Sequence, residues 1–213
     1  MMTLFHCQFG VVARSKAGDA RKMSAYQHCT RVARRDGQDF DFRRKAGEHV
    51  AHAVMLPDGA AAWAADPAAL WQACEDAERR GDAQTARLVE IAIPREVPAD
   101  RRMEMMRAIA RPWITDGMTA QVDIHCTTAT DGGTQPHAHI LLTMRRLDTD
   151  GPCGLAAKKE RGWNADFTAD QGRTMRSAIA GRMNEFMWRH GITARVNHRT
   201  HAAQAIGSPA PSV

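Results

Sequence analysis

Three histidines in the second half of the chain have a spacing typical of a metal site. In the segment 136–142, PHAHILL, polar and apolar residues alternate as on a half-buried strand, so His137 and His139 face the same side. His125 lies on the preceding alternating segment, and a hairpin between the two would bring it opposite that pair. An exposed His-x-His pair alone is common, but a third imidazole favours a metal site with one side open to a substrate. Three imidazoles suit zinc, and with a bound phosphate oxygen they also suit manganese or magnesium.

Two carboxylates are candidates for the same face. In the alternating segment 87–93, the residues on either side of Glu90 are apolar and point the other way. If the apolar faces all meet helices, Glu90 shares the open face with the histidines, where it could orient an imidazole or act as a general base. An ordinary exposed strand carboxylate is an equally good interpretation from spacing alone. Asp123, two residues before His125, is a weaker candidate on the same argument.

The chain contains a single tyrosine, Tyr26, within a segment that we expect to be helical from Asp19, its capping residue, to about Arg34. Taken alone, this tyrosine is best interpreted as a residue that packs against the sheet. A phenol is a weak nucleophile at neutral pH unless a metal ion or a base assists it. A three-histidine site that held a phosphate would supply such assistance.

Composition excludes several classes of protein. The five cysteines are scattered and form no CxxC pair, which argues against a disulfide scaffold or a zinc ribbon. No apolar run is long enough to cross a bilayer, and residues 1–10 contain no secretory signal, so we expect a cytoplasmic protein. The net charge of +5 is compatible with nucleic-acid binding. There is no GxGxxG or Walker A loop, which argues against a nucleotide-cofactor fold.

The elements that must position these residues follow from periodicity and turn signals. Strands are expected at 2–8, 49–56, 86–94, 120–126 and 138–145, and helices at 19–34, 66–80, 98–115 and 168–190. Alternation with one polar face favours an α+β fold in which a central, largely antiparallel, five-stranded sheet is covered by helices on one face. Residues 207–213, GSPAPSV, are expected to be a disordered tail or the start of a linker.

Three motifs together resemble a known family. They are RSKAGDARKMSAYQHCT at 14–30, LWQACEDAERRGDAQTARLVEIAIPRE at 70–96 and DGGTQPHAHILLTMR at 131–145. They are similar, in the same order, to motifs of the MobA/MobL relaxases, nucleases of the His-hydrophobic-His (HUH) superfamily, and in particular to those at the N-terminus of TraA conjugation proteins. The resemblance runs from about Thr3 to about Ala203. It implies the relaxase architecture, with residues 1–206 as the nicking domain.

The resemblance also implies a reaction. Tyr26 would attack one phosphodiester at a transfer origin, which gives a 5′-phosphotyrosyl DNA intermediate with a free 3′-hydroxyl that can later be rejoined. His125, His137 and His139 match the metal-binding triad, which implies a divalent ion (Mn²⁺ or Mg²⁺, with Zn²⁺ possible). Glu90 matches the carboxylate of the E-x-A-x-P-x-E motif. The implied partners are single-stranded DNA of the origin with an adjacent hairpin, accessory relaxosome proteins and a coupling protein, in the bacterial cytoplasm.

Two further stretches resemble the family. GLAAKKERGWN at 154–164 resembles its G-x-x-x-K…W-N stretch, and NHRT at 197–200 resembles its D-H-R-S motif, with Asn197 where the family has Asp. Basic clusters around such a nuclease motif favour phosphate contacts. The candidates for DNA binding are Arg14, Lys16, Arg21, Lys22, Arg34, Arg35, Arg43, Arg44, Lys45, Lys158, Lys159 and Arg161, with Trp163 available to stack on a base. For each cluster the alternative is a solvated surface, and for Trp163 a core position. We expect structural roles for His6, His49 and His52.

Three other functions remain open at this point. A rolling-circle replication initiator of the same superfamily would nick DNA similarly, although the segments around Glu90 and 154–164 argue against it. A non-catalytic DNA-binding protein with a structural zinc site would be indifferent to the loss of Tyr26. A three-histidine zinc hydrolase of small molecules would show metal-dependent turnover without any need for Tyr26.

Overall fold

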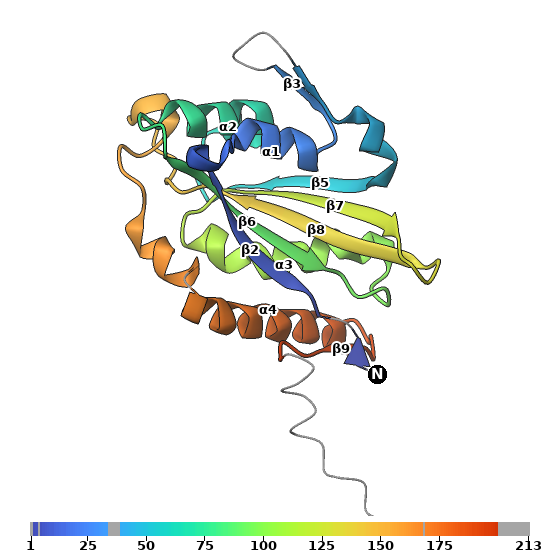
Figure 1. Ribbon diagram of the computed structural model, residues 1–213. Coiled ribbons are helices and arrows are strands. Elements are labelled where there is room, and N and C mark those ends of the chain that lie inside the picture. The colour runs from blue at the N-terminus through green and yellow to red at the C-terminus, as the bar shows by residue number, and fades with distance from the viewer. Residues whose placement is uncertain (1, 4, 34–38, 168, 200–213) are drawn as a thin grey trace, which may run out of the picture.

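The computed structural model describes residues 2–3, 5–33, 39–167 and 169–199. At its centre is a five-stranded sheet in which every neighbouring pair is antiparallel (Figure 1). In spatial order the strands are β2 (Cys7–Ala13), β6 (Gln84–Ala92), β8 (Thr134–Leu142), β7 (Ala120–Thr128) and β5 (His49–Met55). The α+β class and the five-stranded antiparallel sheet predicted from the sequence are confirmed.

Helices α3 (Arg102–Thr115) and α4 (Ala169–Arg189) cover one face of this sheet. That face carries the apolar alternation of three strands, including Val89, Val122 and Ile140, each fully buried. These side chains pack with the methionine-rich inner side of α3 and with residues of α4 in one continuous core. Burial of large apolar side chains on this scale is the main stabilising contribution to the fold.

Helices α1 (Ala20–Gln27) and α2 (Pro67–Asp76) lie on the opposite face (Figure 1). The expectation that helices cover only one face therefore needs correction. The reason is that the second face is polar only along half of its length. At the other end, Ala86, Leu88 and Leu141 join Leu70 and Trp71 of α2 in a second apolar core. The polar half of this face carries the histidines.

Most predicted helices and strands are confirmed to within a few residues, and the differences have local causes. Asp19 caps α1 by accepting hydrogen bonds from the backbone N–H groups of Arg21 and Lys22. The helix ends at Gln27 rather than near residue 34, because Cys29 adopts a left-handed backbone with φ of 53°. The first strand divides into β1 (Met2–Thr3) and β2, with His6 in the segment between them.

Short strands and 3-10 turns complete the chain. β3 (Arg31–Ala33) pairs with β4 (Asp39–Asp41), and β1 pairs in parallel with β9 (Arg195–Val196). The 3-10 segments are Arg14–Lys16, Arg43–Glu48, Ala62–Ala65, Ala99–Arg101, Pro152–Gly154 and Arg161–Phe167. Within the described ranges, none of the helices combines the length and apolarity that crossing a bilayer requires. The expected tail 207–213 lies outside the described residues.

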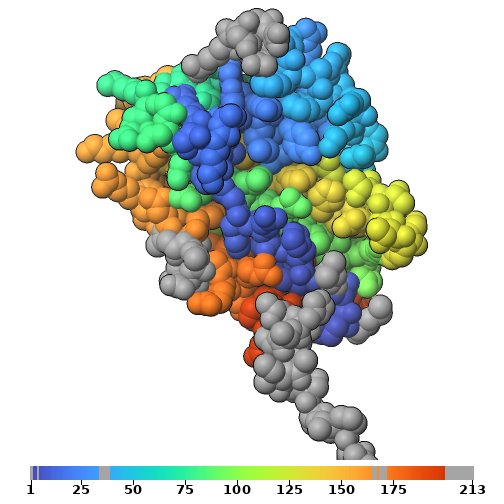
Figure 2. Space-filling model, viewed as in Figure 1, coloured from blue at the N-terminus to red at the C-terminus, as the bar shows by residue number. Residues whose placement is uncertain are grey.

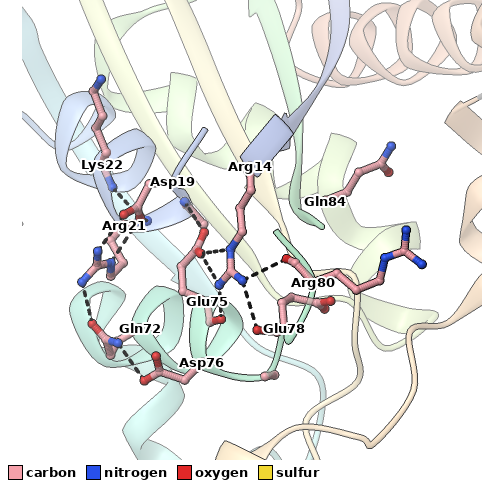
Figure 3. Close-up of polar contacts among 12 residues, drawn as sticks. Arg14, Asp19, Arg21, Lys22, Gln72, Glu75, Asp76, Glu78, Arg80 and Gln84 are labelled. Carbon is pink, nitrogen blue, oxygen red and sulfur yellow. Dashed lines mark hydrogen bonds and ion pairs between the residues drawn. The ribbon is translucent and has the colours of Figure 1, made fainter. Parts of the chain in front are cut away.

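A buried carboxylate joins helices α1 and α2. Glu75 of α2 is only 3% exposed and accepts hydrogen bonds from the backbone N–H of Ala20 at 2.7 Å and from the Arg14 guanidinium at 2.9 Å and 3.1 Å (Figure 3). Arg14 also donates to backbone carbonyl oxygens of Glu75, Glu78 and Arg80. A charge at this depth is tolerated because every polar partner is satisfied.

We therefore expect Glu75→Gln to lower the free energy of unfolding by ~2–4 kcal/mol. The neutral amide offers one acceptor oxygen to the three N–H donors that the carboxylate binds, and it removes the negative charge that faces the Arg14 guanidinium. Chemical denaturation followed by circular dichroism measures this change. Asp82→Asn, which removes the exposed partner of Arg80, serves as the matched control and should leave the midpoint almost unchanged. Equal effects of the two substitutions would contradict this interpretation of Glu75.

Candidate active site

The β7–β8 hairpin brings the three histidines together. His125 pairs directly with His137 across the hairpin, and His139 lies two residues further along β8 on the same face. The ring centroids are 5.6 Å apart for His125 and His137, 5.0 Å for His125 and His139, and 5.1 Å for His137 and His139. One ring nitrogen from each lies within 4.8 Å of the other two. The arrangement that the sequence predicts for these residues is present.

Each of these imidazoles has a ring nitrogen near an oxygen acceptor. His125 Nε2 lies 2.6 Å from the carbonyl oxygen of Gln27, and His137 Nδ1 lies 3.1 Å from that of Gln135. His139 Nδ1 is 3.8 Å from Oε2 of Glu90, its cross-strand neighbour on β6. Metal-binding histidines commonly contact a carbonyl or carboxylate through one nitrogen, which leaves the other for the metal ion. The donor set therefore fits a divalent cation.

Burial lowers the pKa of two of these imidazoles, those of His125 and His139. Burial and the positive charges that His137 and His125 would carry together lower the pKa of His139 to about 4. Burial also lowers the pKa of His125. Since only a neutral imidazole can coordinate a metal ion, both rings are in the binding form at neutral pH.

The two candidate carboxylates differ in their surroundings. Glu90 lies on the open face against His139, with a third of its side chain exposed. Asp123 is completely buried, and its Oδ1 lies within hydrogen-bond distance of His28, His49 and His52, while Oδ2 accepts from Gln121. Burial alone would raise the pKa of Asp123, but the hydrogen bonds from His49, His52 and Gln121 outweigh it and hold that pKa well below its usual range. Asp123 is therefore a poor candidate for a base that must reach substrate.

Tyr26 lies near the end of α1, and its side chain is 37% exposed. The Tyr26 hydroxyl accepts a hydrogen bond from Lys45 Nζ at 3.1 Å, and the same ammonium lies 4.7 Å from the centre of the phenol ring. Phe42 packs edge-on against that ring. The hydrogen bond to Tyr26 raises the pKa of Lys45, so the ammonium stays charged. The positive charge of the same ammonium also contributes, after burial and the other histidines, to the low pKa of His139.

Polar contacts fix the end of α1 on the sheet. The backbone carbonyl oxygen of Gln27 contacts the His125 ring, and the His28 ring contacts Asp123 at 3.0 Å. One turn earlier, Ser24 donates a hydrogen bond of 2.7 Å to Gln121. In the space-filling view, the segments that follow α1, in light blue, lie against the yellow β7–β8 hairpin (Figure 2). Tyr26 is thus placed beside the histidine cluster.

The predicted DNA-binding residues are not all placed to bind DNA. Arg14 and Arg21 are engaged within the protein, Arg14 with Glu75 and Arg21 with Asp19 and Gln72 (Figure 3). Trp163 is 4% exposed and belongs to the core, with Arg146 over its ring, and therefore has no face for a base. The basic residues around Trp163 in the sequence favour a surface position, and no local pattern indicates its burial.

The remaining basic residues fall into two groups. Lys22, Arg43, Arg44 and Lys45 lie on α1 and the adjoining segment beside Tyr26, and Lys16 is exposed just before α1. In contrast, Lys159 contacts Glu78 and the carbonyl oxygen of Gln84, at the far end of β6 from Glu90, about 20 Å along the strand. Lys158 and Arg161 are exposed next to it. Arg34 and Arg35 lie outside the described residues.

Two features of the site were not anticipated from the sequence. Lys45 was expected to contact DNA, whereas the structure places its ammonium on the Tyr26 hydroxyl. The second feature is that His28, His49 and His52 converge on Asp123. In the sequence, only the residue types of these four residues indicate such a cluster. His28 follows Tyr26 by two residues, but its proximity to the other two histidines depends on the pairing of β5 with β7.

Comparison with known proteins agrees with this architecture. A solved structure from a study entitled "Molecular Basis of Vancomycin Resistance Transfer in Staphylococcus aureus" has the same fold, with a TM-score of 0.78 at 23% identity over 93% of this chain and 100% of that one. The model of the MobA/MobL family matches residues 19–212. The chain belongs to the MobA/MobL family, as its motifs predict.

Individual relatives are consistent with this assignment. A probable conjugal transfer protein TraA of Sinorhizobium fredii is 31% identical over 96% of this chain and 20% of its own length. Mobilization protein MobL of Acidithiobacillus ferridurans is 30% identical over 96% of this chain and 60% of its length. A probable mobilization protein MobA of Bifidobacterium longum is 34% identical over 69% of this chain. The chain thus spans only a fifth of that TraA and three fifths of that MobL.

The low pKa of His139 predicts that the metal-free protein loses stability in acid. Between pH 6.5, the ordinary imidazole value, and about 4, the unfolded chain binds a proton that the folded chain does not, so the free energy of unfolding falls as pH falls. We expect His139→Gln to remove ~2–3 kcal/mol of this pH dependence in EDTA-treated protein. Denaturant titrations at several pH values measure it. His190→Gln, at the exposed end of α4, should keep the wild-type slope, and the same slope in His139→Gln would contradict the prediction.

Proposed function

We propose that this chain carries the nicking domain, residues 1–206, of a conjugative DNA relaxase that cuts and rejoins one strand through Tyr26. The observation that carries the proposal is the placement of the only tyrosine beside the three-histidine cluster, joined to it through Gln27 and His125. Membership of the MobA/MobL family and the names of the relatives, which concern conjugal transfer, mobilization and relaxation, support it.

His125, His137 and His139 would hold a divalent cation, Mn²⁺ or Mg²⁺, with Zn²⁺ as an alternative. A bound divalent ion neutralises charge on the non-bridging oxygens of a phosphodiester and orients it for in-line attack. Within the protein, the carboxylate of Glu90 lies 3.8 Å from Nδ1 of His139, from where a small shift lets it orient that ring by a hydrogen bond. Burial lowers the pKa of His125 and of His139, so these two rings are neutral and available as ligands.

In the reaction, the Tyr26 oxygen forms a bond to phosphorus while the bond from phosphorus to the 3′-oxygen breaks, and the 3′-oxygen leaves as a hydroxyl after taking up a proton from water. The Lys45 ammonium, 3.1 Å from the phenol oxygen, stabilises the negative charge that develops there as Tyr26 loses its proton. Glu90 is the carboxylate on the open face that can accept that proton, since Asp123 is enclosed. The phosphotyrosyl ester keeps the energy of the original bond, so attack by a 3′-hydroxyl reverses the step.

The substrate would be single-stranded DNA of a bacterial transfer origin, bound in the cytoplasm of the donor cell. Accessory relaxosome proteins and a coupling protein would be the partners. Phosphate contacts are best assigned to the cations beside Tyr26, namely the exposed Arg43 and Arg44 and the half-buried Lys22, because their charges border the site. Lys158, Lys159 and Arg161 lie too far along the sheet to contact the same phosphate.

We expect a covalent protein–DNA adduct when the protein is incubated with Mn²⁺ and an oligonucleotide that spans the cognate origin. The adduct is measured as a shifted band on a denaturing protein gel. Tyr26→Phe should abolish it, because no other tyrosine is present, and His137→Ala or EDTA should reduce it at least ~100-fold. DNA binding by Tyr26→Phe, measured by fluorescence anisotropy, should be retained.

The alternatives give different outcomes in that assay. Strand cleavage that persists in Tyr26→Phe with no adduct would indicate a metal hydrolase. DNA binding with neither adduct nor cleavage on the cognate strand would indicate a non-catalytic DNA-binding module. Either outcome would overturn the tyrosine mechanism.

Removal of the ammonium from Lys45 tests its role at the nucleophile. We expect Lys45→Met to slow single-turnover adduct formation ~10–100-fold at neutral pH while changing the affinity for DNA only slightly. The rate should recover partly at high pH, where the phenol ionises without help. Lys158→Met, an equal loss of charge at the other end of the sheet, is the control and should keep the wild-type rate. A Lys45→Met variant that nicks normally would exclude this role.

A further inference from the structure

A second cluster of imidazoles lies beside the triad and shares no residue with it. His28 at the end of α1, His49 and His52 on β5, and Asp123 on β7 place one ligand atom each within 4.8 Å of the others. Nδ1 of His28, Nε2 of His49 and Nδ1 of His52 are 3.0, 2.8 and 2.8 Å from the same oxygen, Asp123 Oδ1. Side chains from the end of α1 and from β5 therefore converge on one oxygen atom of β7, although the three elements are distant in the sequence.

Hydrogen bonding alone accounts poorly for this convergence. A carboxylate oxygen has about two lone-pair sites, and here three ring nitrogens compete for them while Gln121 already occupies the other oxygen. The carboxylate is completely buried, so water cannot share the load. A carboxylate enclosed at this depth is costly unless a positive charge accompanies it. A cation among the four ligands would remove both difficulties.

We propose that His28, His49, His52 and Asp123 form a second metal site, which binds a divalent transition ion of the zinc class with four protein ligands. Three imidazole nitrogens and one carboxylate oxygen are a donor set that Zn²⁺ accepts, and they suit a tetrahedral ion. Ligand atoms around a tetrahedral zinc at ~2.0–2.1 Å lie ~3.3–3.4 Å apart, so the observed contacts need to open by only a few tenths of an ångström.

The two sites differ in what they can do. The triad offers three ligands and an open side, as a site for substrate requires, whereas the second cluster supplies four ligands and is closed, as structural sites are. Its position gives the ion a function: His28 lies two residues after Tyr26, and the other ligands lie on β5 and β7. An ion here fixes the end of α1 to two strands and so holds the tyrosine in place.

The test counts metal ions in the whole chain without DNA. EDTA-treated protein is incubated with excess Zn²⁺, freed of unbound ion by gel filtration and analysed by mass spectrometry of the metal. We expect two ions per wild-type chain, one in His52→Ala, one in His137→Ala and none in the double variant. His52 is preferred to His49 because the His49 ring lies 5.4 Å from that of His125, in the triad.

Two further measurements keep the test decisive. If His52→Ala does not fold, His28→Ala carries the same expectation, since its side chain is 31% exposed at the end of a helix. Zinc-edge X-ray absorption of His137→Ala should show three imidazole nitrogens and one oxygen at about 2.0–2.1 Å. The proposal is overturned if His137→Ala binds no zinc, or if wild-type protein binds a single ion that His52→Ala retains.

These outcomes are independent of the nicking reaction. The zinc count in Tyr26→Phe should equal that of the wild type, whether or not the protein forms a DNA adduct. If zinc at this site positions Tyr26, His52→Ala with its triad loaded should form the adduct more slowly while its affinity for DNA is unchanged.

Discussion

The placement of Tyr26 depends on a line of polar contacts between helix α1 and strand β7. Ser24, residue 27 and His28 lie on one side of the helix at the i, i+3 and i+4 positions, and they meet Gln121, His125 and Asp123, which alternate along one face of the strand. Residue 24 and the pair 27–28 are one helical turn apart, and together they contact three alternate residues of the strand. The line joins the nucleophile's helix to the same strand that supplies a histidine of the triad.

These contacts are buried, which makes them specific as well as stabilising. Gln121 is fully enclosed and also accepts a hydrogen bond from Trp71 of α2, so both helices on this face are oriented by one amide. Unsatisfied polar groups at this depth cost more than ordinary hydrogen bonds contribute. A shifted helix would leave several donors and acceptors unpaired at once, and therefore α1 has one favourable position on the sheet.

Much of the site could be predicted because it depends on local alternation. His137 and His139 point to the same face because side chains alternate along a strand, and His125 joins them through a hairpin that a turn signal marks. Neither the shared face nor the hairpin depends on contacts between distant segments. The burial of Trp163 and the internal pairing of Arg14 could not be predicted, because both depend on contacts between segments far apart in the sequence.

The same limit applies to the second histidine cluster. His49 and His52 were expected to be structural, yet their convergence with His28 required the β5–β7 register, which contains an irregularity between His49 and Ala51. Likewise, the contact of Lys45 with Tyr26 depends on how the 3-10 segment Arg43–Glu48 returns to the end of α1. Sequence patterns locate residues on faces, but they do not state which faces meet.

The central claim is that the histidine triad and Tyr26 act on one phosphate. Anomalous X-ray diffraction from crystals of Tyr26→Phe grown with Mn²⁺ and an uncleaved origin oligonucleotide tests it most directly. The account predicts an anomalous peak bound by His125, His137 and His139, with a DNA phosphate between that ion and the ring at position 26. A phosphate bound away from the triad, or manganese absent from these three histidines, would contradict it.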